Sequence, residues 1–246
     1  MIFEDIVGKV NIKELKPVNH VSFILDCSGS MFSITDRSRD SFNEQLQRLK
    51  SESHDQDTYV TLAMFNEKVE FKYVDRPINE CEELTEYPAN GMTALYDAIG
   101  LTINKIIHGV KKEENHSALI VIITDGHENA STDYFGEEGR KKVKSKVEEL
   151  EGEGNWTFTF LGANVDVEQV ASEGLAMSMA NTMSFDGCDS GVEAASLNIN
   201  SGIGNYYNAR RSGETQTSSF YGGSDGDKTQ GETTEEEEDK GQTIKG

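Results

Sequence analysis

Short, almost entirely apolar runs alternate with segments of helical periodicity along residues 18–211. The most apolar run, residues 118–124, is followed at once by Asp125, and another, residues 21–25, is followed by Asp26. Runs of this length without polar alternation are typical of strands that helices cover on both faces, as in a parallel sheet. The alternation therefore predicts an α/β fold with a doubly wound sheet.

The order of the segments predicts how the sheet is connected. Strands are expected at residues 21–25, 59–65, 69–74, 118–124, 156–161 and 181–185. Helices are expected near residues 42–49, 93–107, 143–150, 167–175 and 192–206. The third strand follows the second after a tight turn, so this pair should be antiparallel, with the third strand at an edge. The other strands should be parallel through right-handed crossovers. The prediction is a mostly parallel sheet of about six strands with helices on both faces.

Oxygen-bearing side chains follow two of the predicted strands and begin a central helix. Asp26, Ser28 and Ser30 come after the first strand, Asp125 follows the fourth, and Thr93 lies at the start of a helix. Ligands of such sheets bind at the carboxyl ends of the strands. Carboxylate and hydroxyl oxygens suit a hard divalent cation, with Mg²⁺ favoured and Mn²⁺ or Ca²⁺ as alternatives. If the direct ligands are mostly neutral hydroxyls, the cation keeps its positive charge and attracts a carboxylate of a partner.

These residues, in this order and on these predicted elements, resemble the metal-ion-dependent adhesion site of von Willebrand factor A (VWA) domains. The resemblance covers residues 18–211 and implies a Rossmann-like VWA fold. It implies that Ser28 and Ser30 bind the metal directly and that Thr93 does so in the ligand-engaged state. Asp26 and Asp125 would accept hydrogen bonds from metal-bound waters, and either carboxylate could approach the ion. The open coordination position would take a Glu or Asp of a protein partner.

A narrower likeness and two alternatives remain open. Residues 161–164 and 181–184 resemble stand-alone VWA proteins of bacteria and their phages. One alternative is a structural or virion-type assembly subunit in which the metal is only a staple. The other is a Mg²⁺-dependent hydrolase, but the sequence shows no activated nucleophile and no phosphate-binding loop. The five histidines are scattered, so a zinc site is not expected. We therefore expect a binding protein and not an enzyme.

Charge restricts the class of partner. The chain has 44 acidic and 23 basic residues and a formal net charge of −21. A nucleic-acid groove needs clustered Lys and Arg, so nucleic acid is not an expected partner. No apolar stretch is long enough to span a membrane. Glu4 and Asp5 lie where a secretion signal needs positive charge, so a cytoplasmic location is expected. The sequence assigns no oligomeric state.

Composition divides the chain into three parts. Residues 1–17 form an N-terminal extension, residues 18–211 form the VWA domain, and residues 212–246 form an acidic tail rich in Gly, Ser and Thr. The only large apolar residues of the tail are Phe220, Tyr221 and Ile244. A segment of this composition is expected to be disordered because it buries too little apolar surface to offset its ordering entropy.

Overall fold

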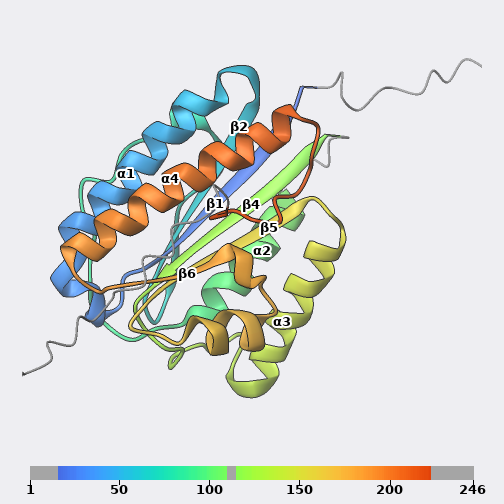
Figure 1. The fold of residues 1–246 in the computed structure, drawn as a ribbon. Coiled ribbons are helices and arrows are strands. Elements are labelled where there is room, and N and C mark those ends of the chain that lie inside the picture. Colours follow the sequence, from blue (N-terminus) through green and yellow to red (C-terminus); the bar gives the residue numbers. More distant parts are fainter. Residues whose placement is uncertain (1–15, 110–114, 223–246) are drawn as a thin grey trace, which may run out of the picture.

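The computed structural model describes residues 16–109 and 115–222, and these residues contain one six-stranded sheet. The strands are β1 (Val18–Asp26), β2 (Asp57–Phe65), β3 (Val69–Pro77), β4 (His116–Thr124), β5 (Trp156–Ala163) and β6 (Thr182–Phe185). Their order is β3-β2-β1-β4-β5-β6 (Figure 1). β3 lies at an edge and is antiparallel to β2, and every other neighbouring pair is parallel. The predicted α/β fold class and the predicted antiparallel edge strand are thus confirmed.

Two layers of helices cover the sheet. The α-helices are α1 (Thr35–Glu52), α2 (Leu95–Gly109), α3 (Gly136–Gly152) and α4 (Asp189–Arg211). α1 and α4 lie side by side on one face, and α2 and α3 lie on the other (Figure 1). The predicted short helix at residues 167–175 is a π-helical segment, Glu168–Glu173. No helix in the described residues is long and apolar enough to cross a membrane.

The pleat of β1 explains why its sequence shows no polar alternation. Val21, Phe23 and Leu25 pack with the residues of α1 and α4, while Ile24 packs with those of α2 and α3. All nine residues of the strand are buried. Successive side chains of a strand point to opposite faces, so a strand between two helical layers needs apolar residues at consecutive positions.

Residues 212–222, here called the C-terminal strap, pack against the domain. Phe220 is 0% exposed and its ring lies against Gly202 of α4, where an added Cβ would have no room. The backbone N–H of Phe220 donates to Asn181 Oδ1 at 2.7 Å, and Thr159 Oγ1 donates to the Tyr221 hydroxyl at 2.6 Å. The prediction that disorder begins at residue 212 is therefore wrong for the strap. Its two adjacent aromatic residues bury enough surface to order it, although the average composition of residues 212–246 does not indicate this. Residues 223–246 of the predicted tail and residues 1–15 of the predicted extension lie outside the described residues.

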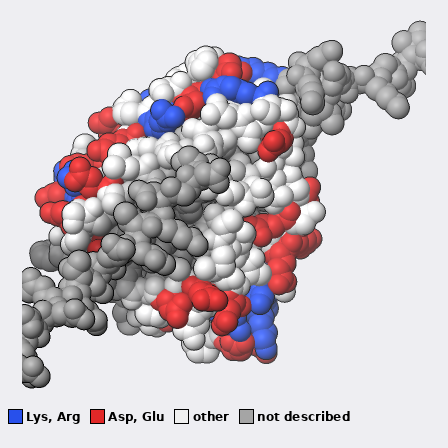
Figure 2. Space-filling view, in the orientation of Figure 1, with Lys and Arg blue, Asp and Glu red and all other residues white. Residues whose placement is uncertain are grey.

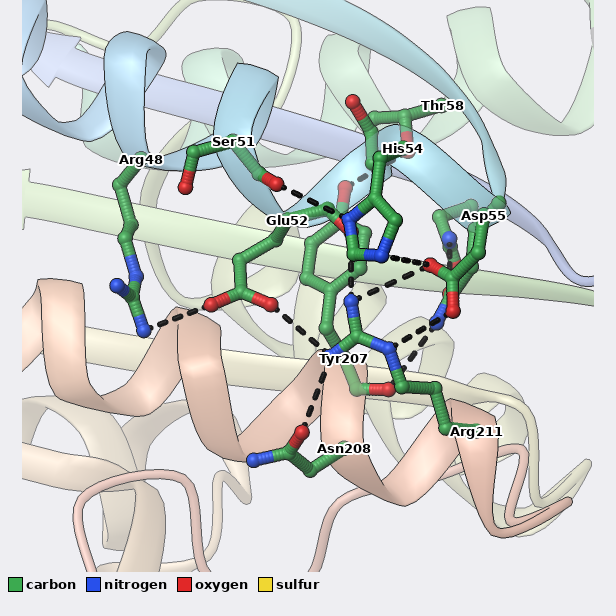
Figure 3. A network of polar contacts seen from close by, with 12 residues as sticks. Arg48, Ser51, Glu52, His54, Asp55, Thr58, Tyr207, Asn208 and Arg211 are labelled. Atoms are coloured by element: carbon green, nitrogen blue, oxygen red, sulfur yellow. Dashed lines mark hydrogen bonds and ion pairs between the residues drawn. The ribbon is translucent and has the colours of Figure 1, made fainter.

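Polar contacts join the end of α4 to the end of α1, as Figure 3 shows. Arg211 donates through Nε to Asp55 Oδ2 at 3.0 Å and through Nη1 to Glu52 Oε2 at 2.9 Å. Glu52 also pairs with Arg48 at 2.7 Å. We call this cluster, with Arg210, the amino-edge junction, because it lies beside the start of β1 and far from the strand ends that carry the predicted metal ligands.

Arg210 anchors the same end of α4 to the sheet. Its side chain is buried and donates through Nε to Asn19 Oδ1 at 3.0 Å and through Nη2 to Asn115 Oδ1 at 2.9 Å. It also donates through Nη1 to the Glu214 carbonyl oxygen at 2.8 Å. These bonds connect α4, β1 and the strap, so the amino edge of the sheet is closed by contacts within the chain.

Candidate metal centre

The candidate site lies where the strand order reverses. β1 has β2 on one side and β4 on the other, and ligands of doubly wound sheets bind in the crevice at such a point. The parallel register pairs Leu25 with Ile123, so the carboxyl ends of β1 and β4 finish side by side. Asp26 ends β1, and Asp125 directly follows β4. The topology thus brings these two carboxylates to the same crevice.

Asp26 is held in one orientation by three groups. Its Oδ1 accepts the backbone N–H of Ser28 at 2.7 Å, and its Oδ2 accepts the Thr124 hydroxyl at 2.5 Å. Its carbonyl oxygen accepts the Tyr87 hydroxyl at 2.6 Å. Thr124 is not among the site residues that the sequence predicts. The sequence feature that could have identified Thr124 is its position: it is a hydroxyl residue at the end of an apolar run, directly before Asp125.

The two serines and the second aspartate form a short hydrogen-bonded chain. Ser28 Oγ and Ser30 Oγ are 3.0 Å apart, and the Ser30 hydroxyl donates to Asp125 Oδ1 at 2.6 Å. Neighbouring ligands of an octahedral Mg²⁺ at about 2.1 Å lie about 3.0 Å from each other. The two serine hydroxyls therefore already have the spacing of two adjacent ligands.

Thr93 reaches the same point from the loop before α2. Its backbone N–H donates to Asn129 Oδ1 at 2.8 Å, and its carbonyl oxygen accepts the Asn129 N–H at 2.9 Å. Its hydroxyl lies over Gly126, where an added Cβ would be 3.0 Å from Thr93 Oγ1 and 3.6 Å from Asp26 Oδ2. A side chain at position 126 would crowd both oxygens, so glycine keeps the space between them open. All five residues predicted from the sequence thus lie together.

Backbone contacts fix the loop of Ser28 and Ser30 against the loop of Thr93. The Gly29 N–H donates to the Gly91 carbonyl oxygen at 3.1 Å, and the Met92 N–H donates to Glu67 Oε2 at 3.1 Å. Gly91 has a φ of +77°, a conformation that favours glycine, and any Cβ there would collide with the Glu67 carboxylate. These contacts hold the hydroxyl-bearing loops close to each other.

The electrostatics of the site favour a cation. Burial raises the pKa of Asp26, the bonds from Thr124 and Ser28 oppose this rise, and the charge of Asp125 adds to it. Burial also raises the pKa of Asp125, against the hydrogen bond from Ser30. In the part of the chain that the structure describes, no Lys or Arg is among the main causes of either shift. A divalent ion between the two carboxylates would supply the missing positive charge.

The donor set fits a hard cation better than zinc. Within residues 16–109 and 115–222, no three His, Cys, Asp or Glu side chains are grouped so that they could hold a metal. The candidate site instead combines two carboxylates with three hydroxyls. Oxygen donors of this kind suit Mg²⁺, Mn²⁺ or Ca²⁺, whereas zinc sites are built from Cys, His and carboxylate ligands.

The von Willebrand factor type A domain family matches residues 20–196, which include all five residues of the candidate site. The chain belongs to this family. No curated protein sequence matches the chain. The family assignment therefore rests on the domain match and agrees with the observed fold.

Solved structures of other proteins share this fold at low sequence identity. The pilus adhesin SpaC from Lactobacillus rhamnosus GG aligns with a TM-score of 0.57 and 14% identity, over 77% of this chain and 31% of its own. The vWF domain of the type V pili tip protein Mfa5 from Porphyromonas gingivalis has a TM-score of 0.51 and 10% identity, over 76% and 96%. Proximal thread matrix protein 1 from the mussel byssus has a TM-score of 0.51 and 12% identity, over 75% and 46%.

These likenesses establish the fold of the VWA domain. The chain spans less than half of the mussel protein and about a third of SpaC. The functions of those longer proteins therefore do not transfer to it directly, and its own role has to be argued from the residues of the candidate site.

Proposed function

We propose that this VWA domain is a metal-dependent protein-binding module that captures a Glu or Asp carboxylate of a partner through a divalent cation. Mg²⁺ is the proposed ion, with Mn²⁺ and Ca²⁺ as alternatives. The observation that carries the proposal is the chain of oxygens from Ser28 Oγ to Ser30 Oγ at 3.0 Å and on to Asp125 Oδ1 at 2.6 Å. These donors come from two loops and converge on the topological switch point of the sheet.

The neutral hydroxyls and the charged carboxylates of the site would have different roles. The hydroxyls of Ser28, Ser30 and Thr93 would contact the ion, and the carboxylates of Asp26 and Asp125 would hold its bound waters or approach it. The ion supplies a positive charge that neutral hydroxyls do not cancel. The role of the chain is to hold these oxygens in place, and the family often mediates metal-dependent protein interactions of this kind.

Binding is proposed in preference to hydrolysis. The hydroxyls at the site donate to carboxylates or to each other, and Asp125 is a weak base for activating Ser30. In the described residues no histidine is bonded to any of the five site residues. A Mg²⁺-dependent hydrolase would be supported only by turnover that disappears in Ser28→Ala.

A protein partner is proposed in preference to nucleic acid. Figure 2 shows acidic side chains in groups around the margin of the visible face, while Lys and Arg form fewer groups. The net charge of −21 would repel a phosphate backbone. A single partner carboxylate would be repelled less by this acidic surface, because the bound cation would neutralise its charge.

The test measures Mg²⁺ binding by calorimetry and partner capture with and without EDTA. Ser30→Ala should weaken both, while Ser33→Ala serves as the matched control because Ser33 is also exposed and lies in the same short 3₁₀ helix, Gly29–Ile34. Thr93→Ala should reduce partner binding more than Mg²⁺ binding. Capture that is equal in EDTA and Mg²⁺ would reject the proposal.

The same experiment separates a binding module from a structural staple. Hydrogen bonds within the chain hold the loops of the site together, so the fold should persist without the ion, and removal of a weakly bound ion should lower the free energy of unfolding only slightly. A large loss of stability in EDTA would favour the assembly role instead.

A further inference from the structure

Two apolar side chains stand exposed beside the candidate metal centre. Phe32 is 76% exposed and lies two residues after Ser30, and Met92 is 55% exposed and directly precedes Thr93. An isolated exposed apolar residue needs no explanation, but apolar side chains that border a binding site indicate a contact surface. The side chains of the two residues donate and accept none of the hydrogen bonds that place the five oxygen donors.

Phe32 and Met92 belong to two loops that meet at the candidate metal centre, where the Gly29 N–H donates to the Gly91 carbonyl oxygen at 3.1 Å. In a 3₁₀ helix the side chains at i and i+3 are eclipsed, so Phe32 projects from the same side as Gly29. That side faces the Met92 loop, because an added Cβ at Gly29 would lie 3.4 Å from the Gly91 carbonyl oxygen. Met31 and Ile34, also at i and i+3, form a separate row about 120° away, and both are buried. Phe32 and Met92 thus flank the joint between the two metal-binding loops.

We propose that Phe32 and Met92 form the apolar part of the partner-binding surface. The partner segment is one in which the coordinating Glu or Asp lies between apolar residues. This inference deepens the proposed function and rests on it. The carboxylate would complete the shell of the ion while its apolar neighbours cover the exposed ring of Phe32 and the thioether of Met92.

The charges around the site support this choice of segment. The exposed Glu67 carboxylate accepts the backbone N–H of Met92, and Asp125 borders the other side of the centre. The ion can neutralise one incoming carboxylate, but further acidic residues beside it would face Glu67 and Asp125. An acidic run therefore fits the surface less well than a single carboxylate with apolar neighbours.

The experiment uses three labelled synthetic peptides and the full chain. The first carries Leu-Asp-Leu, the second Ser-Asp-Ser and the third Leu-Asn-Leu, in the same uncharged flanking sequence. Binding is measured by fluorescence polarisation in Mg²⁺ and in EDTA. Covering one exposed apolar side chain should tighten binding of the Leu-Asp-Leu peptide about tenfold relative to Ser-Asp-Ser.

The variants connect this preference to the two residues. Phe32→Ser/Met92→Ser should bind both Asp peptides equally while keeping the Mg²⁺ affinity of the parent by calorimetry. Phe135→Ser is the matched control, because Phe135 is also 76% exposed. Phe135 is next to Tyr134, whose hydroxyl accepts a hydrogen bond from Asn104 in the middle of α2, and not next to a residue of the candidate site. This control should keep the tenfold preference.

Each outcome has a separate meaning. If neither Asp peptide binds in a Mg²⁺-dependent way, or if the Asn peptide binds equally well, the proposed function fails and this inference fails with it. If both Asp peptides bind equally and depend on Mg²⁺, the proposed function is retained and the inference is overturned. A Leu preference that persists in Phe32→Ser/Met92→Ser would also overturn it.

Discussion

Polar side chains cluster at both ends of the parallel strands, near their amino ends and near their carboxyl ends. The pKa values of the carboxylates in these two clusters are shifted in opposite directions. At the amino-edge junction, the hydrogen bond from Arg211 lowers the pKa of Asp55. At the metal centre, burial raises the pKa values of both Asp26 and Asp125. The junction balances its acidic charge with a side chain of the same chain, whereas the two carboxylates of the candidate metal centre have no such cationic neighbour among the described residues.

If the proposed function is correct, this difference separates polar burial that stabilises the fold from polar burial that serves binding. The donors of Arg210 go to Asn19, Asn115 and Glu214, so the junction needs no external partner. Asp26 and Asp125 are held rigidly by hydroxyls and a backbone N–H, yet in the described residues neither has a cationic partner. Mutations should therefore change stability at the amino edge and ion binding at the carboxyl edge.

The largest effect on stability is expected for the strap. Phe220→Ala should lower the free energy of unfolding by about 3–5 kcal/mol, because it empties a fully buried aromatic site against α4. Urea denaturation measures this loss, and the Mg²⁺ affinity should stay unchanged. Phe135→Ala, at an exposed position, should change stability by no more than about 0.5 kcal/mol. A loss below about 1 kcal/mol for Phe220→Ala would show that the strap does not anchor α4.

The metal centre should respond in the reverse manner. Ser28→Ala should weaken Mg²⁺ binding by at least about 100-fold, or about 2.7 kcal/mol, with little change in stability. Thr58→Ala is the counterpart near the amino edge, where the Thr58 hydroxyl bonds the Tyr207 hydroxyl at 2.7 Å. It should reduce stability by about 1 kcal/mol and leave Mg²⁺ binding intact. If both variants changed the same property, the proposed separation of the two edges would be wrong.

Glu151 of α3 is a partly buried carboxylate away from the candidate metal centre, and its burial should make stability depend on pH. Burial raises its pKa from 4.5 to about 7. Since the folded-state value is the higher one, the stabilising contribution is fully present below about pH 4.5 and is lost as the pH rises through about 7. Because Glu151 is only half buried, solvent screens this contribution, and the parent chain should lose about 1–2 kcal/mol of stability across this window because of Glu151.

Urea denaturation across this pH window, in saturating Mg²⁺, should show the loss, and Glu151→Gln should remove most of the slope. If Glu151→Gln had the same pH dependence as the parent, the raised pKa of Glu151 would be disproved.

The smallest effect is expected for the exposed part of the junction. Arg211→Ala should cost about 1 kcal/mol or less, because Asp55 is 42% exposed and solvent screens the pair. A double-mutant cycle with Asp55→Ala should give a coupling of about 0.2–1 kcal/mol. A coupling of several kcal/mol would mean that the junction, and not the strap, holds the end of α4.

The sequence alone determined the class of fold and the location of the candidate site. Apolar runs at residues 21–25 and 118–124 identified the central strands, and the tight turn at residues 66–68 identified the antiparallel edge pair. These features are local, since strand burial and turn length are written in consecutive residues. The five oxygen donors were predicted because each directly follows a strand or precedes a helix, and because their pattern resembles the VWA family.

Only the tertiary structure decided which further residues contribute to the candidate site, the amino-edge junction and the strap. The Thr124 hydroxyl is bonded to Asp26 across 98 positions of sequence, and Arg210 reaches Asn19 across 191. The strap is ordered by contacts with Gly202, Asn181 and Thr159, none of which its own composition reveals. The exposure of Phe32 depends on which side of a 3₁₀ helix faces the core. Such features depend on pairs of residues that only folding brings together, so a pattern read along one segment does not contain them.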